Sequence, residues 1–260
     1  MIMNIPYNIE VHDNLISLKQ NIYLWAYIKS LTFYGMWVAE DAVHFEYKLS
    51  SQKIPTDWII YHSHGRQHRL QRAPLASDET SLKKLYLPIY ALWTELNSKL
   101  DNQYELTGNP EGMYTTKEIP PTVDTDLTPG WRVYINAFYN SHSGHGGQGY
   151  VHRDTPLEFN DEKTVTMLYM INPEWYPSWG GELKFYPEDP IGITSDHQQF
   201  NGDGNQNRGY NIGWLDQGRI VSHVPGRLVI YDGRCLHSTT LPGAPLEKPS
   251  LKLVFRARRK

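Results

Sequence analysis

The feature that most limits the fold of this chain is a series of short apolar segments in its second half. From about Arg132 onward the segments are separated by turn residues, and no long helical pattern lies between them. They read RVYINAFY, TVTMLYMI, ELKFY, RIVSHV, RLVIY and LKLVFRA. Short segments of this composition are typical of β-strands. Such a series predicts two packed sheets or a closed barrel.

Helical periodicity is confined to the first half of the chain. Between Asp13 and Gly35, apolar residues recur at the three- and four-residue spacing of a helix. Asp13 is a suitable N-cap and Gly35 a suitable stop. A second helical pattern covers residues 80–100, where Pro88 should kink the helix or mark its true start. Short strands are expected near residues 43–47 and 58–61.

Composition excludes several classes of protein. The formal net charge is −3, which gives no support to a nucleic-acid or acidic-membrane partner. No apolar run approaches the roughly 20 residues of a membrane span, and the first residues do not resemble a signal peptide. The single cysteine, Cys235, excludes an intramolecular disulfide. We therefore expect a globular protein of a reducing cytoplasm.

Three residues suggest a metal site. In GYVHRDTP, His152 and Asp154 share one face of an extended segment because side chains alternate along a strand. The pair alone is equally compatible with a surface ion pair or a turn. A third ligand, His237, follows the predicted strand RLVIY and its DG turn. Two histidines and one carboxylate form the facial triad of non-haem iron(II) oxygenases, although a zinc hydrolase could use the same set.

The order of the motifs narrows these alternatives. HRD, YMINPEW, GGELKFYP, PGRLVIYDGRCLH and KPSLKLVF follow one another along the chain. This series resembles the Fe(II)- and 2-oxoglutarate-dependent dioxygenases, most closely their prolyl 4-hydroxylase branch. The resemblance covers roughly residues 132–255, whereas the first 125 residues or so match no family. It implies a mainly β fold with a double-stranded β-helix core, that is, a cupin-like jelly-roll, and the helical patterns of the first half add N-terminal helices to it.

The resemblance also implies roles for individual residues. The iron ligands, and therefore the catalytic residues, would be His152, Asp154 and His237. The residues that bind 2-oxoglutarate would be Tyr139, Lys248, Ser250 and Lys252. Lys248 is preferred over Lys252 as the partner of the distal carboxylate, which needs a cation with hydrogen bonds when it is buried. Gly180 and Gly181 match the glycine pair before a core strand, whereas Met170 stands where relatives carry a cosubstrate-contacting tyrosine.

The function implied is hydroxylation of an unactivated C–H bond with Fe(II), 2-oxoglutarate and O2, releasing succinate and CO2. The expected substrate is a small molecule, an amino acid or a natural product, and the alternative is a peptidyl-prolyl hydroxylase. A metal-binding β-barrel module without oxygenase chemistry, or a zinc hydrolase, is the alternative from another class.

Because the sequence shows no clean domain linker, we expect one domain, residues 1–260. Residues 1–125 would be a supporting region and residues 126–260 the catalytic core. The polar loop insertion at about 192–213 is expected to act as a lid, and the alternative is a disordered surface insertion. The oligomeric state cannot be inferred from these patterns.

Overall fold

A computed structural model describes residues 8–35, 46–48, 70–76, 78–106, 133–138, 154, 163–186, 219–240, 242 and 248–260. The helices are α1 (Leu18–Ile28), α3 (Glu79–Leu85), α4 (Leu87–Lys99) and the short 3-10 helix η2 (Pro177–Trp179). The strands are β1 (Ile9–His12), β2 (Thr32–Gly35), β3 (Glu46–Lys48), β4 (Leu70–Ala76), β5 (Tyr104–Leu106), β6 (Val133–Phe138), β7 (Thr164–Met170), β8 (Leu183–Phe185), β9 (Arg219–Val221), β10 (Leu228–Asp232), β11 (His237–Thr239) and β12 (Ser250–Arg259). The described chain is mainly β, as the sequence predicts.

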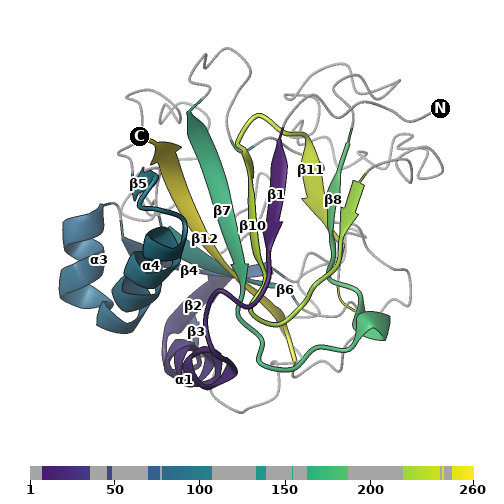
Figure 1. The fold of residues 1–260 in the computed structure, drawn as a ribbon. Helices are drawn as coiled ribbons and strands as arrows, with labels where there is room; N and C mark the ends of the chain where they lie inside the picture. The colour runs from purple at the N-terminus through teal and green to yellow at the C-terminus, as the bar shows by residue number, and fades with distance from the viewer. Residues whose placement is uncertain are drawn as a thin grey trace, which may run out of the picture.

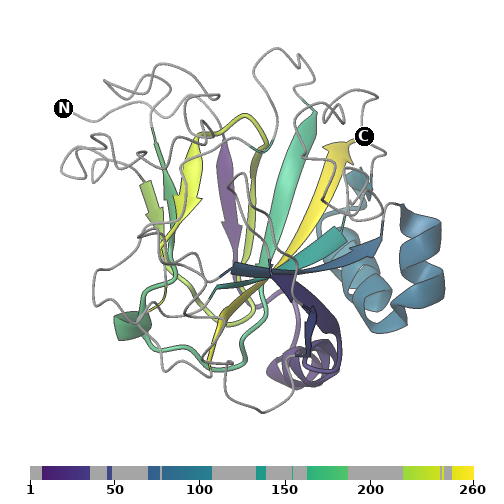
Figure 2. The same cartoon turned by 180° about the vertical axis from the view of Figure 1, so that it is seen from behind.

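The strands form one large and one small antiparallel sheet. The large sheet has the order β1-β10-β7-β12-β6-β4-β2-β3, and β5 pairs with the far end of β12. The small sheet has the order β11-β8-β9. Figures 1 and 2 show α3 and α4 at one side of the large sheet and the small sheet at the other. Most neighbouring strands of the large sheet are not consecutive in the sequence, whereas β2 and β3, and β8 and β9 of the small sheet, are.

The central strand β12 separates two interiors. Its residues Leu251, Leu253 and Phe255 belong to a core that also contains apolar residues of α1, α3 and α4. Its residue Val254 belongs to a second core, which contains Leu183, Phe185 and Val221 of the small sheet. Because side chains alternate along a strand, the polar residues in phase with Val254 face the small sheet. Those residues are Ser250, Lys252 and Arg256.

The first helix is shorter than its periodicity predicts. It begins at Leu18, because Ser17 and Gln20 form a reciprocal capping box at its start. Asp13 does not cap it; the Asp13 carboxylate instead accepts two hydrogen bonds from Arg227, at 2.7 and 2.8 Å. Residues 32–35, predicted to be helical, form strand β2. The partner of Asp13 lies on a distant loop, so local sequence could not identify it.

The second helical pattern is divided in two. Tyr86 ends α3 and precedes α4, and Pro88 lies in the first turn of α4. Proline fits there because the backbone N–H groups of the first helical turn have no acceptor within the helix, so the missing N–H of proline costs no hydrogen bond. The expectation that Pro88 marks a true helix start is therefore confirmed. No helix within the described ranges is long and apolar enough to cross a membrane.

The six strands predicted after Arg132 are all present, as β6, β7, β8, β9, β10 and β12. In the first half, β3 overlaps the expected strand near residues 43–47. The predicted strand at 58–61 and the predicted loop at 192–213 lie outside the described residues. The strands β1, β4, β5 and β11 were not predicted.

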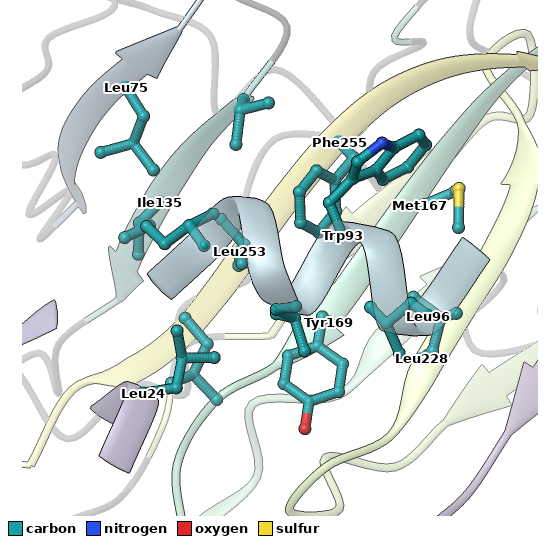
Figure 3. Close-up of a cluster of buried hydrophobic side chains, with 14 of the residues drawn as sticks. Leu24, Leu75, Trp93, Leu96, Ile135, Met167, Tyr169, Leu228, Leu253 and Phe255 are labelled. Carbon is teal, nitrogen blue, oxygen red and sulfur yellow. The ribbon is translucent and has the colours of Figure 1, made fainter. Parts of the chain in front are cut away.

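Trp93 connects the helical layer to the sheet. It is 2% exposed, and its ring lies 5.2 Å from that of Phe255 on β12 (Figure 3). We expect Trp93→Ala to lower the free energy of unfolding by about 3–5 kcal/mol, since it removes a large buried ring and leaves a cavity. Urea denaturation measures this change. Leu85→Ala, at a 60% exposed residue of α3, is the control and should change stability by less than about 0.5 kcal/mol. Equal effects of the two variants would contradict this account of the core.

Candidate functional site

Asp154 is a buried carboxylate held by side chains from three adjacent strands. Its Oδ2 accepts hydrogen bonds from Thr166 Oγ1 of β7 at 2.7 Å and from the Tyr231 hydroxyl of β10 at 3.0 Å. Its Oδ1 accepts from Arg256 Nη2 of β12 at 2.5 Å. A buried carboxylate is stable only when it is paired and hydrogen-bonded. These three donors therefore fix both the charge and the orientation of Asp154.

His237, the first residue of β11, lies beside Asp154. Its Nε2 is 3.7 Å from Asp154 Oδ2, and the imidazole is buried. Its Nδ1 lies 2.9 Å from the carbonyl oxygen of Cys235. Because a carbonyl can only accept, Nδ1 carries a proton, and in the neutral ring Nε2 then presents its lone pair. A backbone carbonyl that fixes the tautomer in this way is the usual support of a metal-binding histidine.

Tyr231 and Arg256 complete the surroundings of this pair. The Tyr231 hydroxyl lies 3.2 Å from His237 Nε2 as well as next to Asp154. Burial, and then the charge of Asp154, raise the pKa of Tyr231 well above its ordinary value, so the phenol stays a neutral donor. Arg256 also donates to the Tyr134 hydroxyl at 2.9 Å and to Thr166 Oγ1. The result is a connected hydrogen-bond network around one carboxylate.

The third predicted ligand, His152, lies outside the described residues, as does Tyr139. Within the described ranges there is no group of three or more His, Cys, Asp or Glu residues that could hold a metal ion. The structure does bring Asp154 and His237 together from distant parts of the chain. A carboxylate and an imidazole lone pair suit Fe(II), Zn(II) and related cations. Any third protein ligand must therefore come from residues beyond those described.

Lys252 is a second buried polar residue on the face of β12 that carries Arg256. It is 0% exposed, its Nζ donates to the Gly181 carbonyl at 2.8 Å, and it lies 4.7 Å from the centroid of the Phe138 ring. Burial lowers the pKa of Lys252 to about 7, and the nearby Glu182 opposes this only in part. No carboxylate among the described residues forms an ion pair with this ammonium. Two of its three N–H donors are therefore available to an anion.

Lys248, the residue that the sequence favoured, has different surroundings. Its side chain is 51% exposed, and its Nζ lies 4.0 Å from a carboxylate oxygen of Glu174 and 5.0 Å from the centroid of the Trp179 ring. Lys248 precedes the first residue of β12, so strand alternation does not direct it toward the small sheet. Ser250, in contrast, is fully buried at the start of the strand. The structure thus groups Ser250 with Lys252 and places Lys248 at the surface.

The glycine pair before β8 has a clear physical reason. Gly180 and Gly181 adopt φ values of 66° and 80°, a region that side chains rarely allow. A Cβ on Gly181 would lie 3.2 Å from the Trp175 ring and 3.3 Å from Ser250 Oγ. Only glycine therefore lets the chain approach Ser250 closely enough for the Gly181 carbonyl to receive Lys252.

Two further residues on β7 point to opposite sides. Met170 lies on the face toward the small sheet and is the register partner of Lys252, and its Sδ lies 3.2 Å from the Val224 amide. Tyr169 faces the helices, and its hydroxyl donates to Asn21 Oδ1 at 3.2 Å. The tyrosine displaced by one position in YMINPEW is therefore turned away from Lys252, as alternation along a strand requires.

Sequence reasoning missed four polar residues at this face: Thr166, Tyr231, Arg256 and His223. A usable signal existed for Arg256, which lies in phase with Ser250 and Lys252 in the last strand. Thr166 and Tyr231 occur in otherwise apolar strands, where a polar residue is easily taken for ordinary strand composition. His223 lies between β9 and β10, where no periodicity applies.

No protein-family model matches this chain, and no curated protein matches it in sequence. Solved structures of prolyl hydroxylases and 2-oxoglutarate-dependent enzymes are similar to it. A Pseudomonas putida prolyl-4-hydroxylase has 12% identity and a TM-score of 0.43, covering 98% of this chain and 94% of its own.

A Trichoplax adhaerens prolyl hydroxylase was solved with a hypoxia inducible factor peptide fragment. It has 16% identity and a TM-score of 0.42, and the match covers 96% of this chain and 83% of the hydroxylase. HygX from Streptomyces hygroscopicus was solved with nickel and 2-oxoglutarate. It has 11% identity and a TM-score of 0.45, and the match covers 98% of this chain and 84% of HygX. The function proposed for the present chain rests on its own residues.

The buried ammonium predicts a specific pH dependence of stability. The pKa of Lys252 is about 7 in the folded chain and 10.5 ordinarily, so between these values the unfolded chain binds more protons. Wild-type stability should therefore rise with pH in this window. Lys252→Met removes the effect, and its gain in stability over wild type should be largest below pH 7, on the order of 5 kcal/mol.

Urea denaturation between pH 6 and 10.5 measures this difference. The gain should shrink as the pH approaches 10.5. Lys248→Met, at the exposed lysine, is the matched control. A difference between Lys252→Met and wild type that stays constant over this range would show that Lys252 is not desolvated in the folded chain.

Proposed function

We propose that this chain is an Fe(II)- and 2-oxoglutarate-dependent oxygenase built on a double-stranded β-helix. His152, Asp154 and His237 would hold the iron, and Lys252 with Ser250 would hold the distal carboxylate of 2-oxoglutarate. The observation that carries the proposal is the placement of two groups on one face of the large sheet. One is the Asp154–His237 pair, and the other is the buried amino group of Lys252, which forms no ion pair with a carboxylate of the described residues.

The residues around Asp154 fit a metal ligand. The carboxylate is restricted to one orientation by Thr166, Tyr231 and Arg256. Binding a metal ion would therefore cost less side-chain entropy than binding by a mobile carboxylate. The Cys235 carbonyl does the same for His237 by binding its Nδ1 proton. Both supports come from the chain itself, so the two described residues of the proposed site are preorganised.

Lys252 supports an oxygenase over a zinc hydrolase. A metal hydrolase needs an activated water but no second, buried cation beside the metal site. A 2-oxo acid that ends in a carboxylate does need one, because its far end enters the protein interior as an anion. When bound, Fe(II), the 2-oxo acid and O2 supply the chemistry that decarboxylates the acid to succinate and oxidises a C–H bond. The chain supplies position, charge balance and exclusion of water.

The substrate proposed is a small molecule, an amino acid or a natural product. The support is the sequence of the first 125 residues, which lacks a match to the prolyl hydroxylase motifs, and the polar insertion at 192–213. A prolyl residue in a peptide is the alternative. The positions of Asp154 and Lys252 do not distinguish the two substrate classes, so a direct assay of both classes distinguishes them.

The proposed function predicts a visible charge-transfer band when Fe(II) and 2-oxoglutarate are added to the protein without oxygen. In air, a panel of metabolites and peptides should reveal a product heavier by one oxygen atom, formed with equimolar succinate. Asp154→Ala and His237→Ala should each abolish the band and the succinate, because each removes a ligand. His12→Ala, at a partly exposed histidine of β1, is the control and should keep both. Full iron affinity in His237→Ala would contradict the ligand assignment.

The proposed anchor predicts a selective loss of cosubstrate affinity. Lys252→Met should weaken 2-oxoglutarate binding by about two to three orders of magnitude, since it leaves a buried carboxylate without its cation. Metal binding should stay nearly unchanged because Lys252 does not contact Asp154 or His237 in the structure. Lys248→Met is the matched control, with little change in either affinity. If Lys248→Met shows the loss and Lys252→Met does not, the anchor is the exposed lysine.

A further inference from the structure

His223 has a buried ring nitrogen without a partner. The residue is 4% exposed, and its ring packs against Trp175 with centroids 4.4 Å apart and planes inclined by 34°. Its Nδ1 lies 3.0 Å from Ser250 Oγ, but its Nε2 has no hydrogen-bond partner in the part of the chain that the structure describes. Buried side-chain nitrogens are nearly always paired, so one that is not needs an explanation. A ligand that accepts a hydrogen bond is one such explanation.

The surroundings of His223 show which kind of ligand would fit. Ser250 and Lys252 lie two residues apart on the same face of β12. Lys252 Nζ donates to the Gly181 carbonyl, and Ser250 Oγ would lie 3.3 Å from a Cβ placed on Gly181. Ser250 reaches His223 directly, so all three side chains belong to one buried cluster. Within the described residues, the cluster holds an amino group that forms no ion pair and a ring nitrogen without a hydrogen-bond partner. Its chemistry is complementary to a carboxylate, which accepts several hydrogen bonds and carries the missing charge.

His223 is neutral in this cluster. Burial, then the charge of Lys252, and then that of Arg227 lower the pKa of His223 well below its ordinary value. The charged groups that act on Lys252 itself include Glu182, which raises the pKa of that lysine. The neutral ring carries one proton. A proton on Nε2, the atom that lacks a partner, requires the Ser250 hydroxyl to donate to Nδ1, and the 3.0 Å distance between these atoms allows this.

We infer that His223 is a specificity-determining residue whose Nε2–H donates to the terminal carboxylate of the 2-oxo acid, beside Lys252. The inference rests on the proposed function and adds a residue to it. Ser250 then has a defined role, since its hydroxyl holds the tautomer of His223. An acid of equal length that ends in a methyl group would leave both His223 and Lys252 without partners. Sites with unpaired buried polar groups discriminate strongly against such analogues.

The test compares three probes on protein loaded with Mn(II), a redox-inactive substitute for Fe(II). The probes are 2-oxoglutarate, 2-oxopentanoate, which lacks the distal carboxylate, and glutarate, which lacks the keto group. Isothermal titration calorimetry gives their affinities for wild type, His223→Phe and His223→Gln. Phenylalanine keeps a ring against Trp175 without the N–H, whereas glutamine supplies an N–H donor. His12→Phe is the control at a histidine outside the cluster.

His223→Phe should weaken 2-oxoglutarate and glutarate by about 10- to 100-fold, the effect of losing one hydrogen bond to a charged group. Its affinity for 2-oxopentanoate should stay unchanged, so the preference for the dicarboxylate falls by the same factor. His223→Gln should recover most of the lost affinity. Equal weakening of all three probes would show a merely structural role for His223, and no weakening would show that it does not contact the ligand. Either result would overturn the inference.

Failure of the proposed function gives a different pattern. If wild type bound glutarate as tightly as 2-oxoglutarate and formed no succinate in air with Fe(II), the oxygenase function would be wrong. The carboxylate site at His223 would stand if His223→Phe still lost affinity for glutarate. If wild type formed succinate while His223→Phe kept the full preference for 2-oxoglutarate, the inference about His223 alone would be wrong.

Discussion

The two-residue alternation of β12 is the constraint on which the rest of the structure depends. Hydrogen bonds to β7 on one edge, and to β6 and β5 on the other, fix the register of this strand. Leu251, Leu253 and Phe255 then face the helices, while Lys252 and Arg256 face the small sheet. A shift of the β12 register by one residue would turn the apolar residues toward the small sheet. It would also bury Lys252 and Arg256 against the helices, away from Gly181 and Asp154.

The network around Asp154 connects folding to the proposed chemistry. Its donors Thr166, Tyr231 and Arg256 come from the adjacent strands β7, β10 and β12, so the carboxylate can be satisfied only when these strands are paired in register. Removing a donor would leave a buried anion partly unpaired, which is costly. The same three bonds that make the buried carboxylate tolerable also hold it toward His237. The stability of the fold and the orientation of the Asp154 carboxylate therefore depend on the same residues.

Strand periodicity and local caps could be predicted to different degrees. The six strands after Arg132 were predicted because each carries its own apolar pattern between turn residues. Pro88 was predicted either to kink a helix or to mark its start, because proline restricts its own backbone, and it lies in the first turn of α4. The N-cap of α1 was misplaced at Asp13, since that carboxylate serves Arg227 instead. A long-range ion pair leaves no trace in the surrounding sequence.

The sequence alone determined the alternation of β12 and the residue types available for chemistry: HRD, the distal His237, and three polar residues at positions 248, 250 and 252. By spacing alone, Lys248 and Lys252 are equivalent, because two-residue alternation puts both on one face. Only the tertiary structure decided between their environments. The strand begins at Ser250, which leaves Lys248 at the surface, while the approach of Gly181 buries Lys252. Burial depends on which segments pack together, and that is a property of the whole fold rather than of any local pattern.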